Sequence, residues 1–210
     1  MDIAYIAIVI GVILISMTLH EVMHGLVAYA LGDDTAKLQG RLTLNPVKHI
    51  DPFLTLILPV MLAIIGAPIF GGAKPVPFNP ARVKYDEWGA AMVAIAGPLT
   101  NLVIAFVVFG LYAVLGMPGG LLGLILTTAV MVNLGFFIFN LIPFPPLDGS
   151  RVLYALAPEF VRRGMEVMER FGIMIVFMII LFANSSIGAL MTASMAFFIE
   201  LFSKIFGLAY

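Results

Sequence analysis

The chain has 210 residues, a mass of 22.7 kDa and a composition that excludes an ordinary soluble domain. It is 62% hydrophobic and only 11% charged, whereas about a quarter of the residues of a typical soluble domain are charged. The net charge of −1 gives no indication of a nucleic-acid partner, and the absence of cysteine excludes disulfides and thiolate ligands. The composition therefore predicts an integral membrane protein whose surface contacts the lipid bilayer.

Stretches without Asp, Glu, Lys or Arg locate the membrane helices, at 3–19, 52–73, 88–147 and 171–199. Because a span needs about 20 residues, the third stretch must hold two spans, with a turn at Gly116–Gly120. A break at 184–186 divides the fourth stretch into a second hairpin. We expect one all-α polytopic membrane domain covering residues 1–210, with five to six transmembrane helices, at about 3–31, 88–115, 121–143, 165–184 and 186–206.

Two connecting segments are expected to differ from simple spans or loops. The alternation in Ala36–Asn45 predicts a short β-hairpin. The apolar segment 52–70 carries Pro59 and Pro68, which remove backbone donors, so it is expected to be re-entrant or half-buried. If it turns back, all eleven Lys and Arg fall on one face, which the positive-inside rule assigns to the cytoplasm. The N-terminus is then outside and the C-terminus inside.

Two of the three histidines lie four residues apart in the first span, in the sequence His20-Glu21-Val22-Met23-His24. Side chains four apart on a helix share a face, so both imidazoles can bind one metal ion. Glu21, next to the first histidine, is placed to accept a proton from a water on that metal. The alternative is that the three polar groups only satisfy one another, but polar groups at this depth are costly and usually functional. The pattern predicts a zinc site with His20 and His24 as ligands and Glu21 as general base.

A catalytic zinc ion that keeps a position for water needs a third protein ligand. Asp148 is the only acidic residue between Glu87 and Glu159, and it follows the proline-rich stretch 140–147 at the end of a predicted span. The prolines make this stretch extended and non-helical, and such backbone is tolerated at membrane depth only where it is buried in protein or lines a cavity. We expect Asp148 to be the third ligand. The alternatives are His49 as ligand and Asp148 as a turn or N-cap residue.

Two asparagines lie in apolar surroundings near the predicted site. The amide of Asn140, at the end of the span 121–143, can donate a hydrogen bond either to a developing oxyanion or to a neighbouring helix. Asn101, in the sequence Gly97-Pro98-Leu99-Thr100-Asn101, is expected to pack between helices.

Three motifs make the chain resemble the site-2 protease family of intramembrane zinc metalloproteases. They are H-E-x-x-H, the sequence AGPLTN at Ala96–Asn101 and the sequence NLIPFPPLDG at Asn140–Gly149, in the order found in the family. The segments Arg41–Pro52 and Lys74–Pro80 look like those of the compact bacterial and archaeal branch, and no inserted PDZ or CBS domain is visible. The resemblance therefore implies a protein of the cell membrane of a bacterium or archaeon, and the positive-inside count leads us to expect its active site toward the cytoplasmic side.

The resemblance also implies the roles of individual residues. Zinc is implied to be held by His20, His24 and Asp148, with Glu21 as general base and Asn140 as a stabiliser of the tetrahedral intermediate. The implied substrates are single-pass membrane proteins, cut within or near their transmembrane segments. The alternative function is a membrane metal transporter or metal-binding protein that uses the same ligands. A transporter, however, should show several ligand sets along a path, and the sequence offers one.

Overall fold

The computed structural model describes residues 3–57, 61, 72–172, 174, 178 and 184–208. Within these ranges the regular elements are helical and no β-strand occurs. Among the described residues, four helices are long and apolar enough to cross a membrane: α1 (Ile3–Ala30), α4 (Asp86–Val114), α5 (Gly120–Asn140) and α9 (Asn184–Ile205). At 1.5 Å per residue, the 21 residues of α5 span about 31 Å, which matches the hydrocarbon core of a bilayer.

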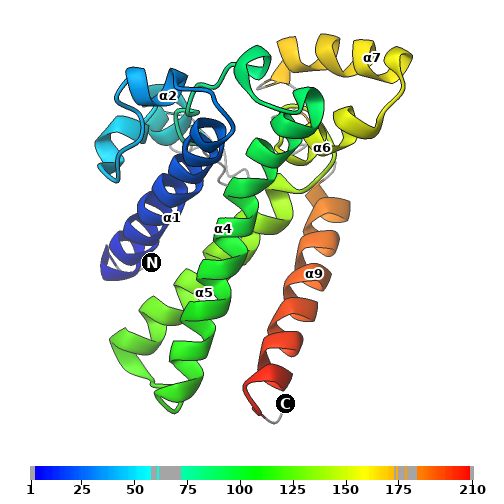
Figure 1. The fold of residues 1–210 in the computed structure, drawn as a ribbon. Coiled ribbons are helices and arrows are strands. Elements are labelled where there is room, and N and C mark those ends of the chain that lie inside the picture. Colours follow the sequence, from blue (N-terminus) through cyan, green and yellow to red (C-terminus); the bar gives the residue numbers. More distant parts are fainter. Residues whose placement is uncertain are drawn as a thin grey trace.

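The long helices form one bundle in which neighbours along the chain alternate in direction (Figure 1). In this view α1 runs upward, α4 downward, α5 upward and α9 downward, so both the first and the last helix point their free ends toward the lower end. A π-helical turn, η2 (Pro52–Ile57), lies between α1 and α4 in sequence. The other short helices gather at the upper end: α2 (Thr35–Leu38), η1 (Pro46–His49), η3 (Pro80–Arg82), α6 (Gly149–Leu156) and α7 (Glu159–Arg170).

The bundle has two kinds of interior. Between α1, α4 and α5 the fully buried side chains include Val93, which packs near Ala28 of α1, but also the polar Asn101 and Asn133. Between α4, α5 and α9 the core is aromatic, with centroids of contacting rings 5.2 to 6.2 Å apart, and its phenylalanines are Phe106, Phe109, Phe137, Phe198, Phe202 and Phe206. The polar interior therefore lies on the side of the bundle that contains α1.

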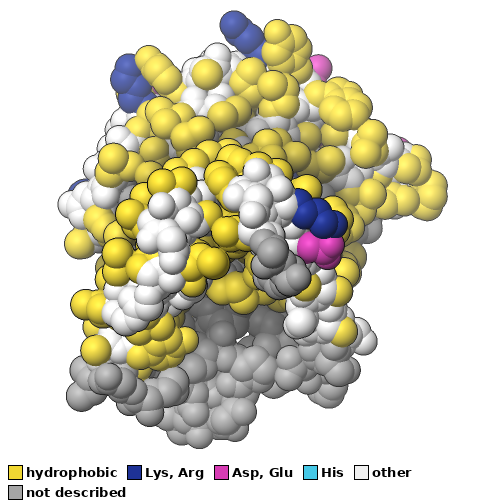
Figure 2. Space-filling model, turned by 90° about the horizontal axis from the view of Figure 1, so that it is seen from below, with side chains coloured by type: hydrophobic (Ala, Val, Ile, Leu, Met, Phe, Trp, Pro, Cys, Tyr) yellow, Lys and Arg dark blue, Asp and Glu magenta, His cyan; other side chains and the backbone are white. Residues whose placement is uncertain are grey.

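Large apolar side chains cover the outside of the long helices. On α4 they recur three or four residues apart, at Leu99, Val103, Val107, Leu111 and Val114. Viewed from the lower end, hydrophobic side chains cover most of the described surface and few charged side chains appear (Figure 2). Soluble proteins rarely expose apolar patches of this extent, so these helices face lipid and the chain is an integral membrane protein.

The predicted β-hairpin at Ala36–Asn45 is wrong. Residues 35–38 form the single helical turn α2, and a loop without strand pairing follows. The backbone N–H groups of Leu38, Gln39 and Arg41 donate to carbonyls four or five residues earlier, so local bonds replace the expected cross-strand ladder. Ala36 is fully buried. Of the apolar positions that suggested alternation, only Ala36 and Leu42 lie against Gly25 of α1, whereas Leu38 and Leu44 are exposed.

The prediction that all eleven Lys and Arg share one face is also wrong. We expected a span at 165–184 followed by a helix returning upward, but α9 begins near the end where α7 lies and runs downward (Figure 1). Lys204, in the last turn of α9, is therefore at the lower end, whereas ten basic residues are at the upper end. The part of 165–184 up to Arg170 belongs to α7, whose three Arg and three Glu make insertion into lipid costly. Most of the remainder lies outside the described residues.

The predictions for the other segments have mixed outcomes. The spans expected at 3–31, 88–115, 121–143 and 186–206 coincide with α1, α4, α5 and α9 to within three residues at each end. The segment 52–70, expected to be re-entrant or half-buried, lies outside the described residues except for Pro52–Ile57 and Met61.

Candidate metal centre

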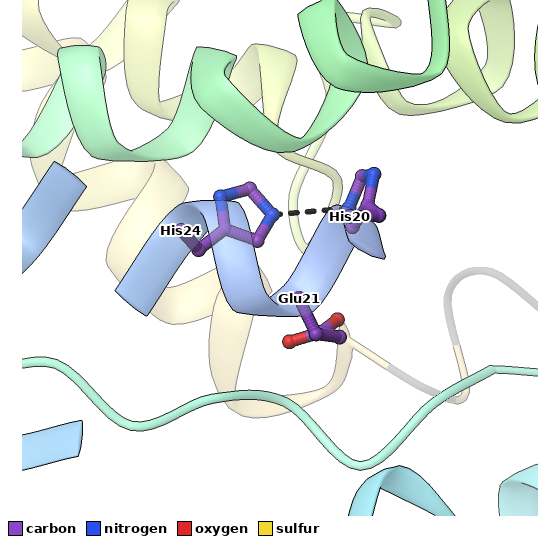
Figure 3. Close-up of side chains that lie close together, drawn as sticks. All are labelled: His20, Glu21 and His24. Carbon is purple, nitrogen blue, oxygen red and sulfur yellow. Dashed lines mark hydrogen bonds between the residues drawn. The ribbon is translucent and has the colours of Figure 1, made fainter. Parts of the chain in front are cut away.

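The H-E-x-x-H residues lie in the C-terminal half of α1, six to ten residues before its end at Ala30. His20 and His24 lie one turn apart and project to the same side of the helix, whereas Glu21 points away from them (Figure 3). One potential ligand atom from each residue lies within 4.8 Å of the others. The helix therefore presents two imidazoles to the bundle interior and a carboxylate toward the loops.

The two imidazoles and the Asp148 carboxylate converge on one point. The Nε2 atoms of His20 and His24 are 3.0 Å apart, and Asp148 Oδ2 lies 3.2 Å from the first and 3.5 Å from the second. The imidazole rings meet edge to face, with centroids 4.6 Å apart. His20 and His24 are 7% and 9% exposed, so this cluster lies within the protein rather than on its surface.

Asp148 reaches the cluster from the loop that links α5 to α6. This loop is a series of tight turns rather than the expected extended stretch, with Leu147 N–H donating to the Phe144 carbonyl at 2.9 Å. Gly149 makes the bend possible, because a Cβ atom there would lie 2.3 Å from the Leu141 carbonyl oxygen. The proline-rich loop thus folds back on the end of α5 and directs Asp148 toward α1.

Close packing of α1 on α4 depends on a glycine of the AGPLTN motif. A Cβ atom on Gly97 would lie 2.4 Å from His24 Nε2 and 2.7 Å from His20 Cε1. Real Cβ atoms essentially never approach other atoms this closely. The two imidazoles can therefore occupy their positions only because residue 97 has no side chain.

Each imidazole also has a partner on its other nitrogen. His24 Nδ1 lies 2.7 Å from the Val93 carbonyl oxygen, and His20 Nδ1 lies 2.7 Å from Asn101 Oδ1. Since a backbone carbonyl can only accept, His24 carries a proton on Nδ1, and Nε2 is the nitrogen that faces the cluster. Metal-binding histidines generally use one nitrogen for the metal and donate from the other in this way.

The cluster fits a zinc ion. Tetrahedral zinc with nitrogen and oxygen ligands at 2.0–2.2 Å places its ligand atoms about 3.3–3.6 Å apart, and the three separations here are 3.0, 3.2 and 3.5 Å. Asp148 Oδ2 is buried and makes no hydrogen bond within the described part of the chain, although both imidazoles adjoin it. A buried acceptor without a donor is unfavourable, and a bound cation removes that penalty.

Glu21 contacts a different part of the protein. Its Oε2 accepts a hydrogen bond of 2.7 Å from the backbone N–H of Val76, in the non-helical segment 72–79 that passes below it in Figure 3. Arg41 holds this segment by donating from Nη2 to the carbonyls of Lys74, at 2.8 Å, and Pro75, at 3.3 Å. One carboxylate oxygen of Glu21 is thereby fixed, and the other is not engaged by this bond.

The remaining candidates occupy other positions. Asn140 Nδ2 donates to the Phe136 carbonyl at 3.0 Å, one turn earlier in its own helix. His49 is buried, its Nε2 lies 2.8 Å from the Thr43 carbonyl, and it is not part of the metal-ligand group found among the described residues. Asn101 does pack between helices, as expected, but it also contacts His20, which the sequence analysis did not anticipate.

Sequence reasoning missed one direct partner of the imidazoles, the Val93 carbonyl, and two residues that connect to His20 through Asn101. The Val93 carbonyl is backbone and leaves no sequence signal. Asn133, which contacts Asn101, could have been noticed as a polar residue in the middle of an apolar span. Ser16 completes this contact from α1, four residues before His20.

The fold and the site define a class, that of polytopic membrane proteins with an H-E-x-x-H metal centre inside the helix bundle. The sequence profile of Peptidase family M50 matches residues 7–119 and 117–183. The chain belongs to Peptidase family M50, the site-2 protease family, whose members are zinc metalloproteases.

Similar proteins come from several bacteria and are assigned by name as zinc metalloproteases. YwhC of Bacillus subtilis is 38% identical over 205 residues, which cover 92% of this chain and 90% of YwhC. Rip2 of Mycolicibacterium smegmatis is 34% identical over 194 residues, covering 85% of this chain and 69% of Rip2. Rip2 of Mycobacterium tuberculosis H37Rv is 30% identical over 176 residues, covering 80% and 64%. No solved structure gives a significant match.

Proposed function

We propose that this chain is an intramembrane zinc endopeptidase that cuts single-pass membrane proteins within or near their transmembrane segments, with residues 1–210 acting as one protease domain. The observation that carries the proposal is the convergence of His20, His24 and Asp148 inside a bundle of lipid-facing helices. His24 lies six residues before the end of α1, about 9 Å along the helix axis, so the site lies below the membrane surface.

In this proposal the residues of the cluster have separate roles. His20, His24 and Asp148 hold the metal, and zinc, when bound, activates water and polarises the scissile carbonyl. Glu21 accepts the proton of the attacking water and passes it to the leaving amine. The bond from Val76 N–H to Oε2 orients the Glu21 carboxylate, so that Oε1 can face the water.

Asn140 is proposed to stabilise the oxyanion of the tetrahedral intermediate. Its amide group has two N–H bonds, of which one is used by the Phe136 carbonyl. The second can donate to the oxyanion, and an amide donor in such a position contributes about 3–4 kcal/mol in other proteases. Its position at the end of α5, where the Asp148 loop begins, supports this role.

The polar upper end of the bundle is proposed to face the cytoplasm. Ten of the eleven basic residues belong to elements at this end: Lys37, Arg41, Lys48, Lys74, Arg82, Lys84, Arg151, Arg162, Arg163 and Arg170. Cytoplasmic loops carry such an excess of Lys and Arg. Water then reaches the site from the cytoplasm, and a substrate helix must unwind there because its carbonyls are otherwise occupied by helical hydrogen bonds.

The test is Glu21→Gln in purified protein reconstituted with a single-pass membrane substrate. Glutamine can keep the bond to Val76 N–H but cannot accept the proton, so cleavage should fall at least about a thousandfold while bound zinc stays near one ion per chain. Glu200→Gln, which removes an exposed carboxylate paired with Lys204 on α9, is the matched control and should cleave normally. Retained cleavage in Glu21→Gln, or zinc flux into proteoliposomes that survives this substitution, would contradict the proposal.

A further inference from the structure

A chain of buried polar side chains leads away from the metal cluster across three helices. Asn101 on α4, Asn133 on α5 and Ser16 on α1 are 0%, 1% and 3% exposed. Asn101 Oδ1 lies 2.7 Å from His20 Nδ1, Asn101 Nδ2 donates to Asn133 Oδ1 at 2.8 Å, and Asn133 Nδ2 donates to Ser16 Oγ at 2.9 Å. Three such groups inside an apolar bundle are costly unless every one of them is paired.

The donor–acceptor direction of these hydrogen bonds is set at Asn133, away from the metal cluster. Asn133 Nδ2 also donates to the Ala129 carbonyl oxygen at 2.8 Å, and a backbone carbonyl can only accept. The Asn133 amide must therefore place its nitrogen at Ala129 and its oxygen at Asn101. Asn101 must in turn present its nitrogen to Asn133 and its oxygen to His20.

The consequence for His20 is a single tautomer. Because Asn101 Oδ1 is an acceptor, His20 Nδ1 must carry the proton and donate it. His20 Nε2 is then left with its lone pair, directed toward His24 Nε2 and Asp148 Oδ2. A neutral imidazole binds a metal only through the nitrogen without the proton, so this is the form that the site needs.

We propose that Asn101, Asn133 and Ser16 form a positioning chain that holds His20 in its Nδ1–H tautomer and so raises its affinity for zinc. This inference rests on the proposed function, because it takes His20 to be a ligand. His24 obtains the same tautomer from the backbone of α4, through Val93, which a side-chain substitution does not remove. The two ligands of one helix are thus oriented by different means, and only the orientation of His20 depends on side chains.

The first test measures zinc affinity of the full chain by competition with a chelator. Asn101→Leu preserves volume but removes the acceptor, and should weaken zinc binding about 10–100-fold. Asn133→Leu should weaken it less, because Asn101 keeps its contact with His20 but loses its fixed orientation. Thr127→Val is the matched control, because this hydroxyl on α5 bonds to the Gly123 and Leu124 carbonyls of its own helix, and its zinc affinity should equal that of the wild type.

Asn101→Asp separates positioning from packing. The carboxylate can still accept from His20, so zinc affinity should remain near the wild-type value. Its second oxygen, however, faces Asn133 Oδ1, so the thermal stability of the protein should fall. Wild-type zinc affinity in Asn101→Leu, or equal losses of affinity in the Asp and Leu variants, would overturn the proposal.

A second measurement does not depend on any variant of the chain folding. Nitrogen-15 NMR of histidine-labelled, zinc-free protein at about pH 8 reports which imidazole nitrogen carries the proton, and the chain has only three histidines. His20 should show a protonated Nδ1. An Nδ1 without a proton on His20 would overturn the positioning chain even if cleavage depends on Glu21, whereas loss of that dependence would overturn the proposed function alone.

Discussion

The two sides of α1 are organised differently around the site. On the side facing α4, His20 and His24 are nearly inaccessible, and each Nδ1 has an acceptor at 2.7 Å on a regular helix. On the opposite side, Glu21 is partly exposed and accepts one backbone hydrogen bond from segment 72–79, which has no helical hydrogen bonds of its own. Helix packing therefore fixes the metal ligands, whereas a loop fixes the proposed base.

Metal binding and proton transfer should therefore be separable, so that a substitution can impair one and leave the other intact. A change on the α4 side should disturb the imidazoles and therefore zinc binding. A change on the loop side should leave zinc in place and alter the orientation of Glu21.

The largest effect is expected from Gly97→Ala. The new Cβ atom would lie 2.4 Å from His24 Nε2, about 1 Å closer than an ordinary contact, so both imidazoles must move. Because a misplacement of 1 Å can cost about a hundredfold in rate, zinc affinity and cleavage should both fall by at least that factor. Gly11→Ala is the control, because Gly11 also lies in a membrane helix but has nothing within 4 Å of the new Cβ atom. It should change neither the zinc affinity measured by chelator competition nor the cleavage rate. Normal zinc binding in Gly97→Ala would show that the α4 side is not rigid.

A smaller effect, confined to catalysis, is expected from Arg41→Gln. Arg41 is buried and donates hydrogen bonds to the carbonyls of Lys74 and Pro75. The N–H of Lys74 in turn donates to the His49 carbonyl, and Val76 follows directly in the chain. Without it, segment 72–79 should hold Glu21 less firmly, and kcat/KM should fall about tenfold, equivalent to roughly 1.4 kcal/mol. Zinc content, measured on the same preparation by atomic absorption, should stay at the wild-type level. Loss of zinc from Arg41→Gln would contradict this separation, because it would show that the loop side also determines metal binding.

The smallest effect is expected from Asp33→Asn and depends on pH. Burial by itself would raise the pKa of Asp33, but hydrogen bonds from the Thr35 hydroxyl and from the N–H groups of Asn79 and Thr35 outweigh it and lower the pKa. Asp33 therefore stabilises the fold above its unfolded pKa of about 3.9, and this contribution is lost as the pH falls through the lower folded value. Near pH 7 the variant should be about 1 kcal/mol less stable.

Thermal unfolding of Asp33→Asn and the wild type between pH 3 and 7 checks this prediction. The difference in Tm should be largest above about pH 5 and should shrink below about pH 4. Asp34→Asn is the control: Asp34 is 46% exposed and pairs with the exposed Arg82, so its substitution should change Tm little at any pH. A pH-independent difference for Asp33→Asn would mean that the carboxylate charge does not hold the loop.

The sequence predicted the long helices well because their signal is simple. Runs of about 20 uncharged residues identify α1, α4, α5 and α9 whatever their packing. The predictions for the shorter segments were less successful. At 36–45, partial alternation suggested strands, but local hydrogen bonds and the burial of Ala36 produced a helical turn. The direction of α9 depends on its aromatic contacts with α4 and α5, which no local pattern reveals.

The site could be predicted from sequence only as far as its chemistry follows from residue type and spacing. The proximity of His20 and His24 follows from helical periodicity, and Asp148 was the only acid within reach of a plausible loop. The partners of the imidazoles could not be found in this way. Asn101 and Asn133 become neighbours only when α4 packs on α5, and the role of the Val93 carbonyl depends on the distance between α1 and α4.

The hydrogen bonds that join α1, α4 and α5 also couple metal binding to the tilt of these helices in the membrane. The contact between His20 and Asn101 is one of the links between α1 and α4, so any change of tilt that lengthens it also releases the His20 imidazole. Helix tilt responds to the thickness of the surrounding bilayer. The rate at which zinc dissociates from the protein should therefore vary with the acyl-chain length of the lipids in reconstituted vesicles. That rate would then report how strongly the bilayer alters the packing of the helix bundle.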